Sequence, residues 1–278
     1  MPRPATTIVQ LSDTHITEGG RLAYGKVDTH AALARAVAHV ERLPETLGPL
    51  AAVVVTGDLT AIGTEAEYAA FRQIVAPLRV PLLVLPGNHD ARGPMRAAFA
   101  DRGLPAGEGP IDYAGEAGDG GSVALEPTVR GAAHGARAAD QIAWRDATLA
   151  AAPDRPTLLF VHHPPFDTGI GHMDRQRLRD EGPFLETLAR HPQVLLVGCG
   201  HVHRTISTSL AGVPCRIAPS PAHAVSLVYG EGRPTFDLEP GGVTIHRWQP
   251  AEGAPFGRLQ SQLSFVGPFE GPHPFFPD

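Results

Sequence analysis

The chain has 278 residues, of which 42% are hydrophobic and 19% are charged, and its formal net charge is -6. This length suits one large core or a core domain with a small appendage, and the composition excludes a disordered or fibrous protein. The acidic balance, without any Lys/Arg-rich run, argues against a large nucleic-acid partner. No apolar stretch approaches the ~20 residues that a membrane-spanning helix needs, so we expect no membrane segment.

Two features of the sequence bear on the cellular compartment. Cys199 and Cys215 are the only cysteines, which suits a reducing compartment and excludes a multi-disulfide framework. The first apolar run ends in polar residues at 12–15, too early to leave room for a cleaved signal peptide. We therefore expect a cytoplasmic protein.

Five short runs of Val, Leu, Ile and Phe have the length and the β-branched content of strands that are covered on both faces. Between them, apolar residues recur at helical spacing, and two of these stretches begin with a capping signal: Asp28 or Thr29, and Thr64 followed by Glu67. The alternation predicts an α/β fold. The strand runs are TIVQLSDTH, AAVVVTGDL, PLLVLPGNHD, TLLFVHHPP and VLLVGCGHVH. The helices are expected at 28–43, at 64–76, at 138–151 and from about Pro183 onward.

The remaining segments are richer in glycine and proline. Residues 103–137 are interpreted as loops around short strands such as 121–126. After His203 the helical spacing ceases, which predicts a β-rich part at about 205–266 that builds most of a second sheet. We interpret 1–278 as a single domain. The strands expected in its β-rich part are 205–218, 224–229, 234–238, 242–248 and 259–266.

Side chains that bind metals follow each of the five strand runs. Ligands of open α/β sheets bind beyond the carboxyl ends of the strands, so the five ends describe one convergent site. A mixed set of carboxylate, amide and imidazole donors suits two ions such as Mn, Fe, Zn or Co better than Mg or Ca, and the lack of thiolates disfavours a structural zinc site. The candidate ligands are Asp13, His15, Asp58, Asn88, His162, His201 and His203.

This ligand set predicts chemistry at phosphorus. Two divalent ions held ~3.5–4 Å apart form a clamp that suits in-line displacement, and they lower the pKa of a bound water to about 7. A metal-bound hydroxide can then attack, and no Ser or Cys nucleophile is needed. His89 follows the ligand Asn88 and is placed to give a proton to the departing alkoxide, while Asp90 is placed to orient that imidazole.

The motifs and their order resemble the calcineurin-like metallophosphoesterases. Within that family, the extended forms VTGDLT, PGNHD, FVHHPPF…GIGHMD and GHVHR are similar to the bacterial branch that contains glycerophosphodiesterases and class III 3′,5′-cyclic-nucleotide phosphodiesterases. The resemblance covers about residues 7–248, and the tail GPHPFFPD is similar to a Gly-Pro-aromatic ending of such glycerophosphodiesterases. The motifs are Asp-x-His at 13–15, Gly-Asp at 57–58, Gly-Asn-His-Asp at 87–90, His-His-Pro-Pro at 162–165, Gly-His-x-His at 200–203 and Pro-Ser-x-x-His at 219–223.

The resemblance implies a four-layer α/β/β/α sandwich of two mixed β-sheets, with the metal site at the carboxyl ends of the strands. It also implies that Asp58 bridges the two ions, with His89 near the leaving group. Glu126 departs from the Leu-Asp-Ser expected in this branch, which affects a loop rather than the ligands. The first ion would be held by Asp13, His15, Asp58 and His203, and the second by Asp58, Asn88, His162 and His201.

Other polar residues keep more than one interpretation. His163 either supports the neighbouring ligand or contacts the substrate, His223 either reaches the substrate or is structural, and Asn88 contacts the substrate as well as an ion. The remaining histidines are assigned to structural or surface roles; they are His30, His39, His134, His172, His191, His246 and His273.

The sequence thus predicts a metal-dependent phosphodiesterase that hydrolyses small phosphodiesters of the glycerophosphodiester or 3′,5′-cyclic-nucleotide class. A phosphomonoesterase is the nearest alternative, because the same two ions serve monoesters. A metal-binding scaffold without catalysis is the other. Exposed aromatic residues are unfavourable, so we expect Phe275 and Phe276 of the tail 267–278 to dock on the chain itself or on a neighbour, and hence a homo-oligomer.

Overall fold

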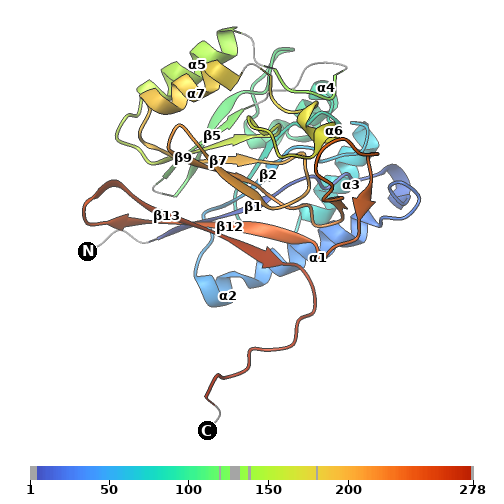
Figure 1. Ribbon diagram of the computed structural model, residues 1–278. Coiled ribbons are helices and arrows are strands. Elements are labelled where there is room, and N and C mark those ends of the chain that lie inside the picture. Colours follow the sequence, from blue (N-terminus) through green and yellow to red (C-terminus); the bar gives the residue numbers. More distant parts are fainter. Residues whose placement is uncertain (1–4, 119, 126–131, 137–138, 180, 277–278) are drawn as a thin grey trace.

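The computed structural model describes residues 5–118, 120–125, 132–136, 139–179 and 181–276. Two β-sheets face each other and helices cover the outer face of each, which gives four layers in the order α/β/β/α (Figure 1). This confirms the α/β fold that the sequence pattern predicts and the four layers that the resemblance implies. Among the described residues, no helix combines the length and the apolar character that crossing a membrane requires.

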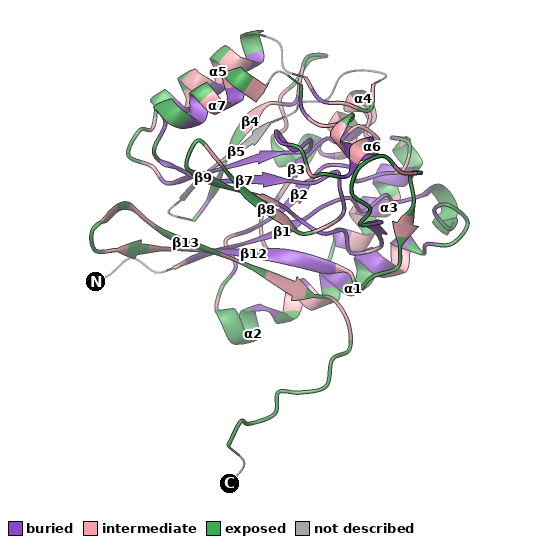
Figure 2. Cartoon of the chain, in the orientation of Figure 1, coloured by how far each residue is buried: buried purple, intermediate pink, exposed green. Residues whose placement is uncertain are grey.

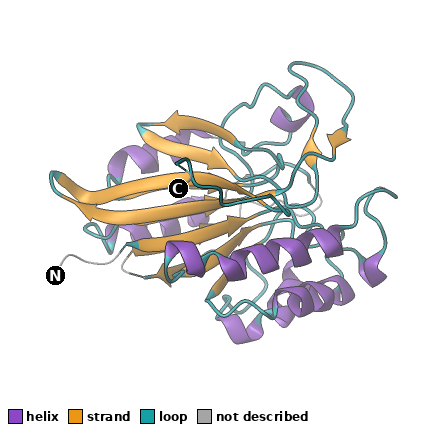
Figure 3. Ribbon diagram, turned by 90° about the horizontal axis from the view of Figure 1, so that it is seen from below, coloured by secondary structure: helices purple, strands orange, loops and turns teal. Residues whose placement is uncertain are grey.

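The first sheet combines parallel strands from the N-terminal part with an antiparallel hairpin from the C-terminal part, in the order β13-β12-β1-β2-β3. The long β12–β13 hairpin projects beyond the neighbouring strands (Figure 3). The strands are β1 (Thr6–Leu11), β2 (Ala52–Thr56), β3 (Leu82–Leu85), β12 (Gly242–Ala251) and β13 (Ala254–Phe265).

The second sheet has the order β4-β5-β6-β7-β9-β8, with antiparallel strands at both edges of a parallel centre. A separate two-stranded ribbon pairs β10 with β11. The strands are β4 (Tyr113–Ala117), β5 (Gly120–Leu125), β6 (Thr157–Val161), β7 (Val194–Cys199), β8 (Ile206–Leu210), β9 (Val213–Ile217), β10 (Ala224–Val225) and β11 (Phe236–Asp237).

Two helices begin at the predicted capping signals. The Asp28 side chain accepts from the backbone N–H of Ala31, and Thr64 with Glu67 forms a reciprocal capping box. The helices are α1 (Thr29–Arg42), α2 (Pro44–Leu47), α3 (Glu65–Val75), α4 (Arg92–Ala98), α5 (Ala139–Ala150), α6 (Gly171–Asp174) and α7 (Glu181–Arg190), with 3-10 turns at Glu18–Gly20 and Ala100–Arg102.

Three apolar clusters fill the spaces between the four layers, and Figure 2 shows the central strands as buried. One packs α1 and α3 on the first sheet, with Leu33 and Phe71 among its members. Another packs α5 and α7 on the second sheet and contains Phe184. The third lies between the sheets and joins Val54 of β2 to Phe160 of β6. Each sheet is therefore covered on both faces over its central strands, as the unbroken apolar runs predict.

A buried polar link also joins the two sheets. The Gln10 amide nitrogen donates to Thr56 Oγ1 and to the carbonyl oxygen of Cys199, each at 2.9 Å. Its Oε1 lies 3.0 Å from His246 Nε2, whose other ring nitrogen lies 2.8 Å from Ser261 Oγ. This confirms a structural role for His246, and every polar group of the link has a partner, as buried groups require.

The C-terminal strands do not build most of the second sheet, so this prediction is wrong. β12 and β13 extend the first sheet instead, and β4 to β7 precede the β-rich part. The run 205–218 is the hairpin β8–β9 rather than one strand, because Ala211 and Gly212 have φ values of 49° and 84°, as a two-residue hairpin turn requires. Apolar alternation indicates a strand, but it does not indicate which sheet edge the strand joins.

The C-terminal tail, residues 267–276, extends away from the rest of the domain (Figure 1). Beyond β13 the chain extends away from both sheets (Figure 1), and Phe275 and Phe276 are 97% and 90% exposed. The structure therefore does not show residues 267–276 docked on the rest of the chain. Glu126, the departure noted in the sequence, lies outside the described residues, so the expected strand 121–126 is described only as far as Leu125.

Candidate metal centre

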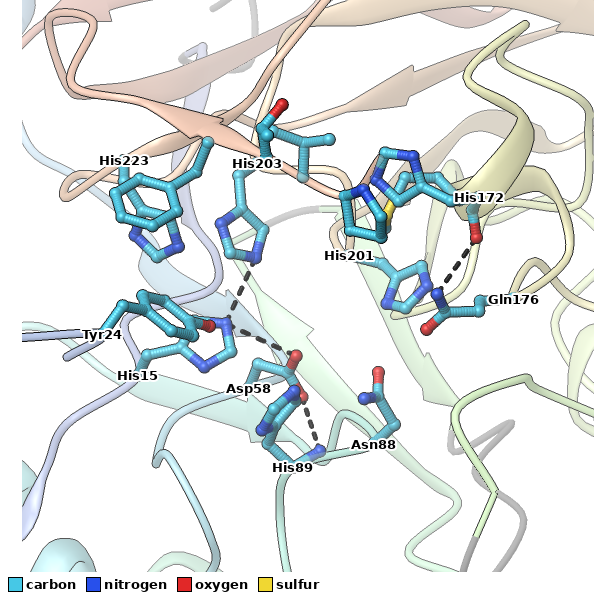
Figure 4. Close-up of a pocket in the computed structure, with 15 residues that line it drawn as sticks. His15, Tyr24, Asp58, Asn88, His89, His172, Gln176, His201, His203 and His223 are labelled. Atoms are coloured by element: carbon cyan, nitrogen blue, oxygen red, sulfur yellow. Dashed lines mark hydrogen bonds and ion pairs between the residues drawn. The ribbon is translucent and has the colours of Figure 1, made fainter. Parts of the chain in front are cut away.

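The carboxyl ends of β1, β2 and β3 meet those of β6 and β7 at one edge of the sandwich, and Figure 4 shows side chains that gather there, among them His15, Asp58 and His203. Hydrogen bonds lock the loops beyond these ends together: Asp13 N donates to Gly57 O, His15 N to Asp58 O, and Gly200 N to His162 O, at 2.9–3.0 Å. The convergence that the five strand runs predict is therefore present. All seven candidate ligands lie at this edge.

Four of these side chains form a tight buried group. His15 Nε2 lies 3.2 Å from His203 Nε2 and 3.6 Å from Asp58 Oδ2, and His203 Nε2 lies 3.4 Å from Asp13 Oδ1. Their four donor atoms all lie within 4.8 Å of one another. This spacing lets a single cation contact all four.

A second group shares Asp58 with the first. His162 Nε2 lies 3.4 Å from Asp58 Oδ2, the same oxygen that faces His15, and 3.2 Å from Asn88 Oδ1. His162, His163 and His201 also bring donor atoms within 4.8 Å of one another. Asp58 therefore lies between two clusters of donors, the position that the bridge implied by the resemblance requires.

The backbone at these residues is unusual. Asp13, His15, Asp58, His201 and His203 all have φ between 45° and 73°, a left-handed conformation that few residues other than glycine adopt. Such strain costs about 1–3 kcal/mol per residue and persists only where the surrounding structure enforces it. The fold therefore holds these five side chains in place against their local preference, which is typical of functional sites.

Three glycines make room for the ligands. A Cβ at Gly57 would overlap the His162 ring, one at Gly87 would overlap the Asp58 carboxylate, and one at Gly200 would overlap Ser12 Oγ and approach Asp13. The glycines of Gly-Asp, Gly-Asn-His-Asp and Gly-His-x-His are thus required by close approach.

Burial keeps most of the imidazoles neutral. It lowers the pKa of His15 to about 3 and holds the pKa values of His201 and His203 well below the ordinary value. A neutral imidazole offers a lone pair to a cation. The Nε2 atom of His201 is buried without a hydrogen-bond partner among the described residues, which fits a nitrogen that serves as a metal ligand.

The two carboxylates respond differently to the same burial. Burial raises the pKa of Asp13 to about 7. At Asp58 and His162, the charge pair outweighs burial, so the pKa of Asp58 falls well below its usual range and that of His162 rises to about 9. Buried carboxylates beside neutral imidazoles are costly unless a cation joins them. The donor set therefore fits divalent metal ions.

His89 is fixed at its backbone and at one ring nitrogen. Its N–H donates to Asp58 Oδ1 at 2.9 Å, and its Nδ1 donates to the carbonyl oxygen of Ala61 at 2.8 Å. The ring lies edge-on to His15, with centroids 4.7 Å apart. Because Nδ1 holds the proton that Ala61 accepts, Nε2 is the nitrogen left to exchange a proton with a substrate.

Asp90 does not orient the His89 imidazole as we expected. Its carboxylate accepts instead from the N–H groups of Leu59, Thr60 and Gly87, and from the hydroxyls of Thr60 and Tyr68, at 2.9–3.3 Å. These bonds tie the loop after β3 to the loop after β2. Asp90 therefore positions the segment that carries His89 rather than its ring.

The two histidines with open interpretations lie on opposite sides of the ligands. His163 Nε2 lies 2.8 Å from the carbonyl oxygen of Ala133, and its ring packs 4.5 Å from that of His201. His223 packs 4.5 Å from His203 and lines a cavity of about 350 Å³ above the donors. His163 is thus buried beside the ligands, while His223 faces the space that a substrate would enter.

The cavity contains residues that the sequence analysis missed. His172, which we assigned to a structural or surface role, lines it from α6, and Gln176 donates to the His172 carbonyl oxygen at 3.0 Å (Figure 4). The segment GIGHMD held a signal for His172, because the family resemblance includes it. Nothing in the sequence pattern marked Tyr24, which lies in a turn, or Phe236, which lies in β11, and both also line the cavity.

Comparison with known proteins agrees with this site. A family model described as calcineurin-like phosphoesterase matches residues 6–205. The chain belongs to this family. The match covers every candidate ligand, and the resemblance seen in the motifs is confirmed.

Individual relatives match over most of their length. A probable glycerophosphodiester phosphodiesterase GpdQ from Arcobacter nitrofigilis is 35% identical, covering 97% of this chain and 96% of the relative. The 3′,5′-cyclic adenosine monophosphate phosphodiesterase CpdA of Escherichia coli is 32% identical, covering 77% and 75%. Among solved structures, a dimetal phosphatase from Danio rerio has a TM-score of 0.60 at 14% identity, covering 95% of this chain and 100% of that one, which supports the fold.

Proposed function

We propose that this protein hydrolyses small phosphodiesters of the glycerophosphodiester or 3′,5′-cyclic-nucleotide class, with two divalent ions. The observation that carries the proposal is the position of Asp58 Oδ2, which lies 3.6 Å from His15 Nε2 and 3.4 Å from His162 Nε2 and so faces both groups of donors. The relatives named as phosphodiesterases support the same activity. We propose Mn, Fe, Zn or Co as the metals, because the donors mix nitrogen with oxygen.

The proposed ligands divide between the ions as the motifs imply, and Asp58 is shared. When bound, the ions would activate a water molecule and offset the charge that develops on the phosphoryl oxygens. Distances of 3.2–3.6 Å between neighbouring donor atoms support this division, and His201 brings a donor atom within 4.8 Å of one of His162. Asp13, His15, Asp58 and His203 would hold one ion, and Asp58, Asn88, His162 and His201 the other.

The chain itself supplies the proton for the leaving group. His89 is the proposed catalytic acid and lines the cavity: its Nδ1–H donates to the carbonyl oxygen of Ala61, so it gives the proton from Nε2 in the doubly protonated, cationic form of the imidazole. The Asp58 carboxylate fixes the backbone of the same residue. Asp90 is proposed as a positioning residue, and Asn88 and His223 as groups that also contact the substrate.

One observation favours diesters over the phosphomonoester alternative. Among the described residues that line the cavity, none is a lysine or an arginine, so no permanently charged cationic side chain adds to the charge of the ions. A diester carries one negative charge and a monoester carries close to two at neutral pH. The charge of the site therefore suits the diester better. A metal-binding scaffold without catalysis is disfavoured, because all the proposed metal ligands are present.

The proposal is tested with the metal-loaded protein and two aryl phosphates. Hydrolysis of bis(4-nitrophenyl) phosphate should exceed that of 4-nitrophenyl phosphate in kcat/KM, and prior treatment with a chelator should abolish both. A reversed order would favour the monoesterase, and tight binding of two ions without any turnover would favour the scaffold. Elemental analysis of the same sample identifies the metals.

We also propose that the chain acts as one domain, in the cytoplasm and as a homo-oligomer. The free, buried Cys199 and Cys215 support a reducing compartment. The exposed rings of Phe275 and Phe276 support a contact with a second copy. Light scattering on the full chain and on a chain ending at residue 266 tests the oligomer, and a monomeric full chain would contradict it.

A further inference from the structure

Three aromatic rings contact one another on one side of the cavity, with His223 edge to face against the other two and Tyr24 tilted by 37° to Phe236. We call Tyr24, His223 and Phe236 the aromatic wall. The ring centroids are 5.4 Å apart for Tyr24 and His223, 5.2 Å for Tyr24 and Phe236, and 5.4 Å for His223 and Phe236. All three residues line the cavity, and Figure 4 shows Tyr24 and His223 together on one side of Asp58.

Tyr24 is held there against its backbone preference. Its φ is 52°, a conformation that bulky residues rarely adopt, and it sits in a tight turn closed by the bridge between Ala23 and Val27. The residue is 58% exposed, so core packing does not account for its position. Strain at an exposed residue that lines a cavity points to a role in binding.

The aromatic wall continues directly from the metal ligands. The His223 ring lies 4.5 Å from that of His203 and 5.8 Å from that of His15. His15 in turn contacts the proposed proton donor His89. A diester held at the ions would therefore place one of its alcohol groups beside the wall.

The chemical character of the aromatic wall determines which alcohol groups of a diester substrate can bind against it. Phe236 is half-buried and its neighbours along the cavity are Val225, Pro234 and Thr235, so this side presents apolar and neutral groups. Because the three rings touch one another, they leave no opening of the kind that an aromatic cage needs to surround a quaternary ammonium group. A flat unsaturated group can stack on such a surface, as nucleobases do on aromatic side chains.

We propose that the aromatic wall stacks on a flat group of the substrate alcohol, such as a nucleobase, so that the enzyme prefers nucleotide-type diesters to glycerol diesters. The proposal rests on the proposed phosphodiesterase function and deepens it. Tyr24 and Phe236 act as specificity residues in this arrangement. They touch the alcohol group rather than the reacting phosphorus.

The first experiment compares substrates on the unaltered, metal-loaded protein. We expect kcat/KM for 3′,5′-cyclic AMP to exceed that for glycerophosphoethanolamine and glycerophosphocholine roughly ten-fold or more, because stacking contributes to binding of the nucleotide alone. Calorimetry should show the same order for the ligands adenosine 5′-monophosphate and glycerol 3-phosphate. Equal or reversed orders in both measurements would overturn the proposal.

The second experiment alters the wall. Tyr24→Ala and Phe236→Ala should each lower kcat/KM for 3′,5′-cyclic AMP roughly ten-fold, mainly through KM, and leave the glycerol diesters within about two-fold. Tyr24→Phe should keep the selectivity, because the ring remains. Tyr229→Ala is the matched control, since Tyr229 is 73% exposed in the same segment as Phe236 and does not line the cavity.

The outcomes separate this inference from the function on which it rests. Absence of metal-dependent turnover of any diester by the unaltered protein would contradict the proposed function. Turnover with an equal loss on both substrate classes in the Tyr24→Ala variant would contradict only the aromatic wall. Tyr24 lies in an exposed turn, so this variant tests the proposal even if Phe236→Ala does not fold.

Discussion

Asp58 and His162 shift each other's pKa in opposite directions across 3.4 Å. Burial disfavours both charges, yet together the two groups form an ion pair in the absence of a cation. A metal ion at this place would replace the proton on His162, so the Asp58 carboxylate that pairs with the protonated imidazole in one state binds the ion in the other. Loading of the site is therefore coupled to proton release.

We predict that Asp58→Asn returns the His162 imidazole to the neutral form in the chelated protein. Its pKa, about 9 with the carboxylate present, should fall, because the largest effects that oppose burial are removed while Asp13 and the carbonyl oxygen of Thr56 still favour the charged form. An NMR titration of the His162 ring follows this change. The same variant should lose both ions in elemental analysis, and retention of both would contradict a bridging role for Asp58.

Gly87→Ala should expel an ion although it replaces none of the proposed ligands. The new Cβ would overlap the Asp58 carboxylate and its backbone nitrogen, so the loop must move, at a cost of about 1–3 kcal/mol. We expect a lower melting temperature and a lower metal content. Gly93→Ala is the control, because a Cβ at Gly93 meets nothing within 4 Å and alanine favours its helix.

His89→Ala and Asp90→Asn should fail in different ways. His89→Ala removes the proposed proton donor, and kcat should fall about 10²- to 10⁴-fold with little change in metal content. Asp90→Asn weakens the bonds that join two loops, so stability and activity should fall together. Thermal unfolding and elemental analysis distinguish the two. Equal loss of rate and metal in His89→Ala would make His89 a ligand or a structural residue.

Acid should destabilise the chelated protein below about pH 6.5, the ordinary pKa of an imidazole. Burial, together with Arg216, lowers the pKa of His246 to about 3, so between these values the unfolded chain binds a proton that the folded chain does not. Stability therefore falls as the pH falls from 6.5 towards 3. This group contributes up to about 2 kcal/mol of that loss at pH 5.

The comparison of urea unfolding at pH 7 and pH 5 measures this loss. His246→Gln removes the titrating group while keeping a polar side chain near Gln10, so the difference between the two pH values should become smaller in that variant. An unchanged difference would assign the acid sensitivity to other imidazoles. Activity of the loaded enzyme should also fall below roughly pH 6, because protons compete with the ions for the ligands.

The sequence predicted the parts of the molecule that follow from local patterns. Unbroken apolar runs located β1, β2, β3, β6 and β7, and the Thr64–Glu67 pair located the start of α3. The residues after those runs converge in the structure because parallel strands carry their ends to the same edge. This rule of topology alone predicts that Asp13 and His203 lie close together.

Other features depend on tertiary structure that the pattern does not contain. β12 joins β1 rather than the second sheet, because either edge can accept an alternating strand. Tyr24 lies in a turn and Phe236 in the short strand β11, neither of which carries a motif, so only the folded chain brings them to His223. The left-handed backbone at Asp13 and His203 likewise follows from the surrounding contacts and not from residue type.

The contact between His15 and His203 joins positions 188 apart in the chain. A cation bound there would connect the loop that carries His15 to the loop that carries His203, which lies more than half the chain length further on. An incompletely synthesised or damaged chain would lack one of these two loops. The ion would thus bind only after both sheets have assembled. Incompletely folded molecules would therefore have no hydrolytic activity.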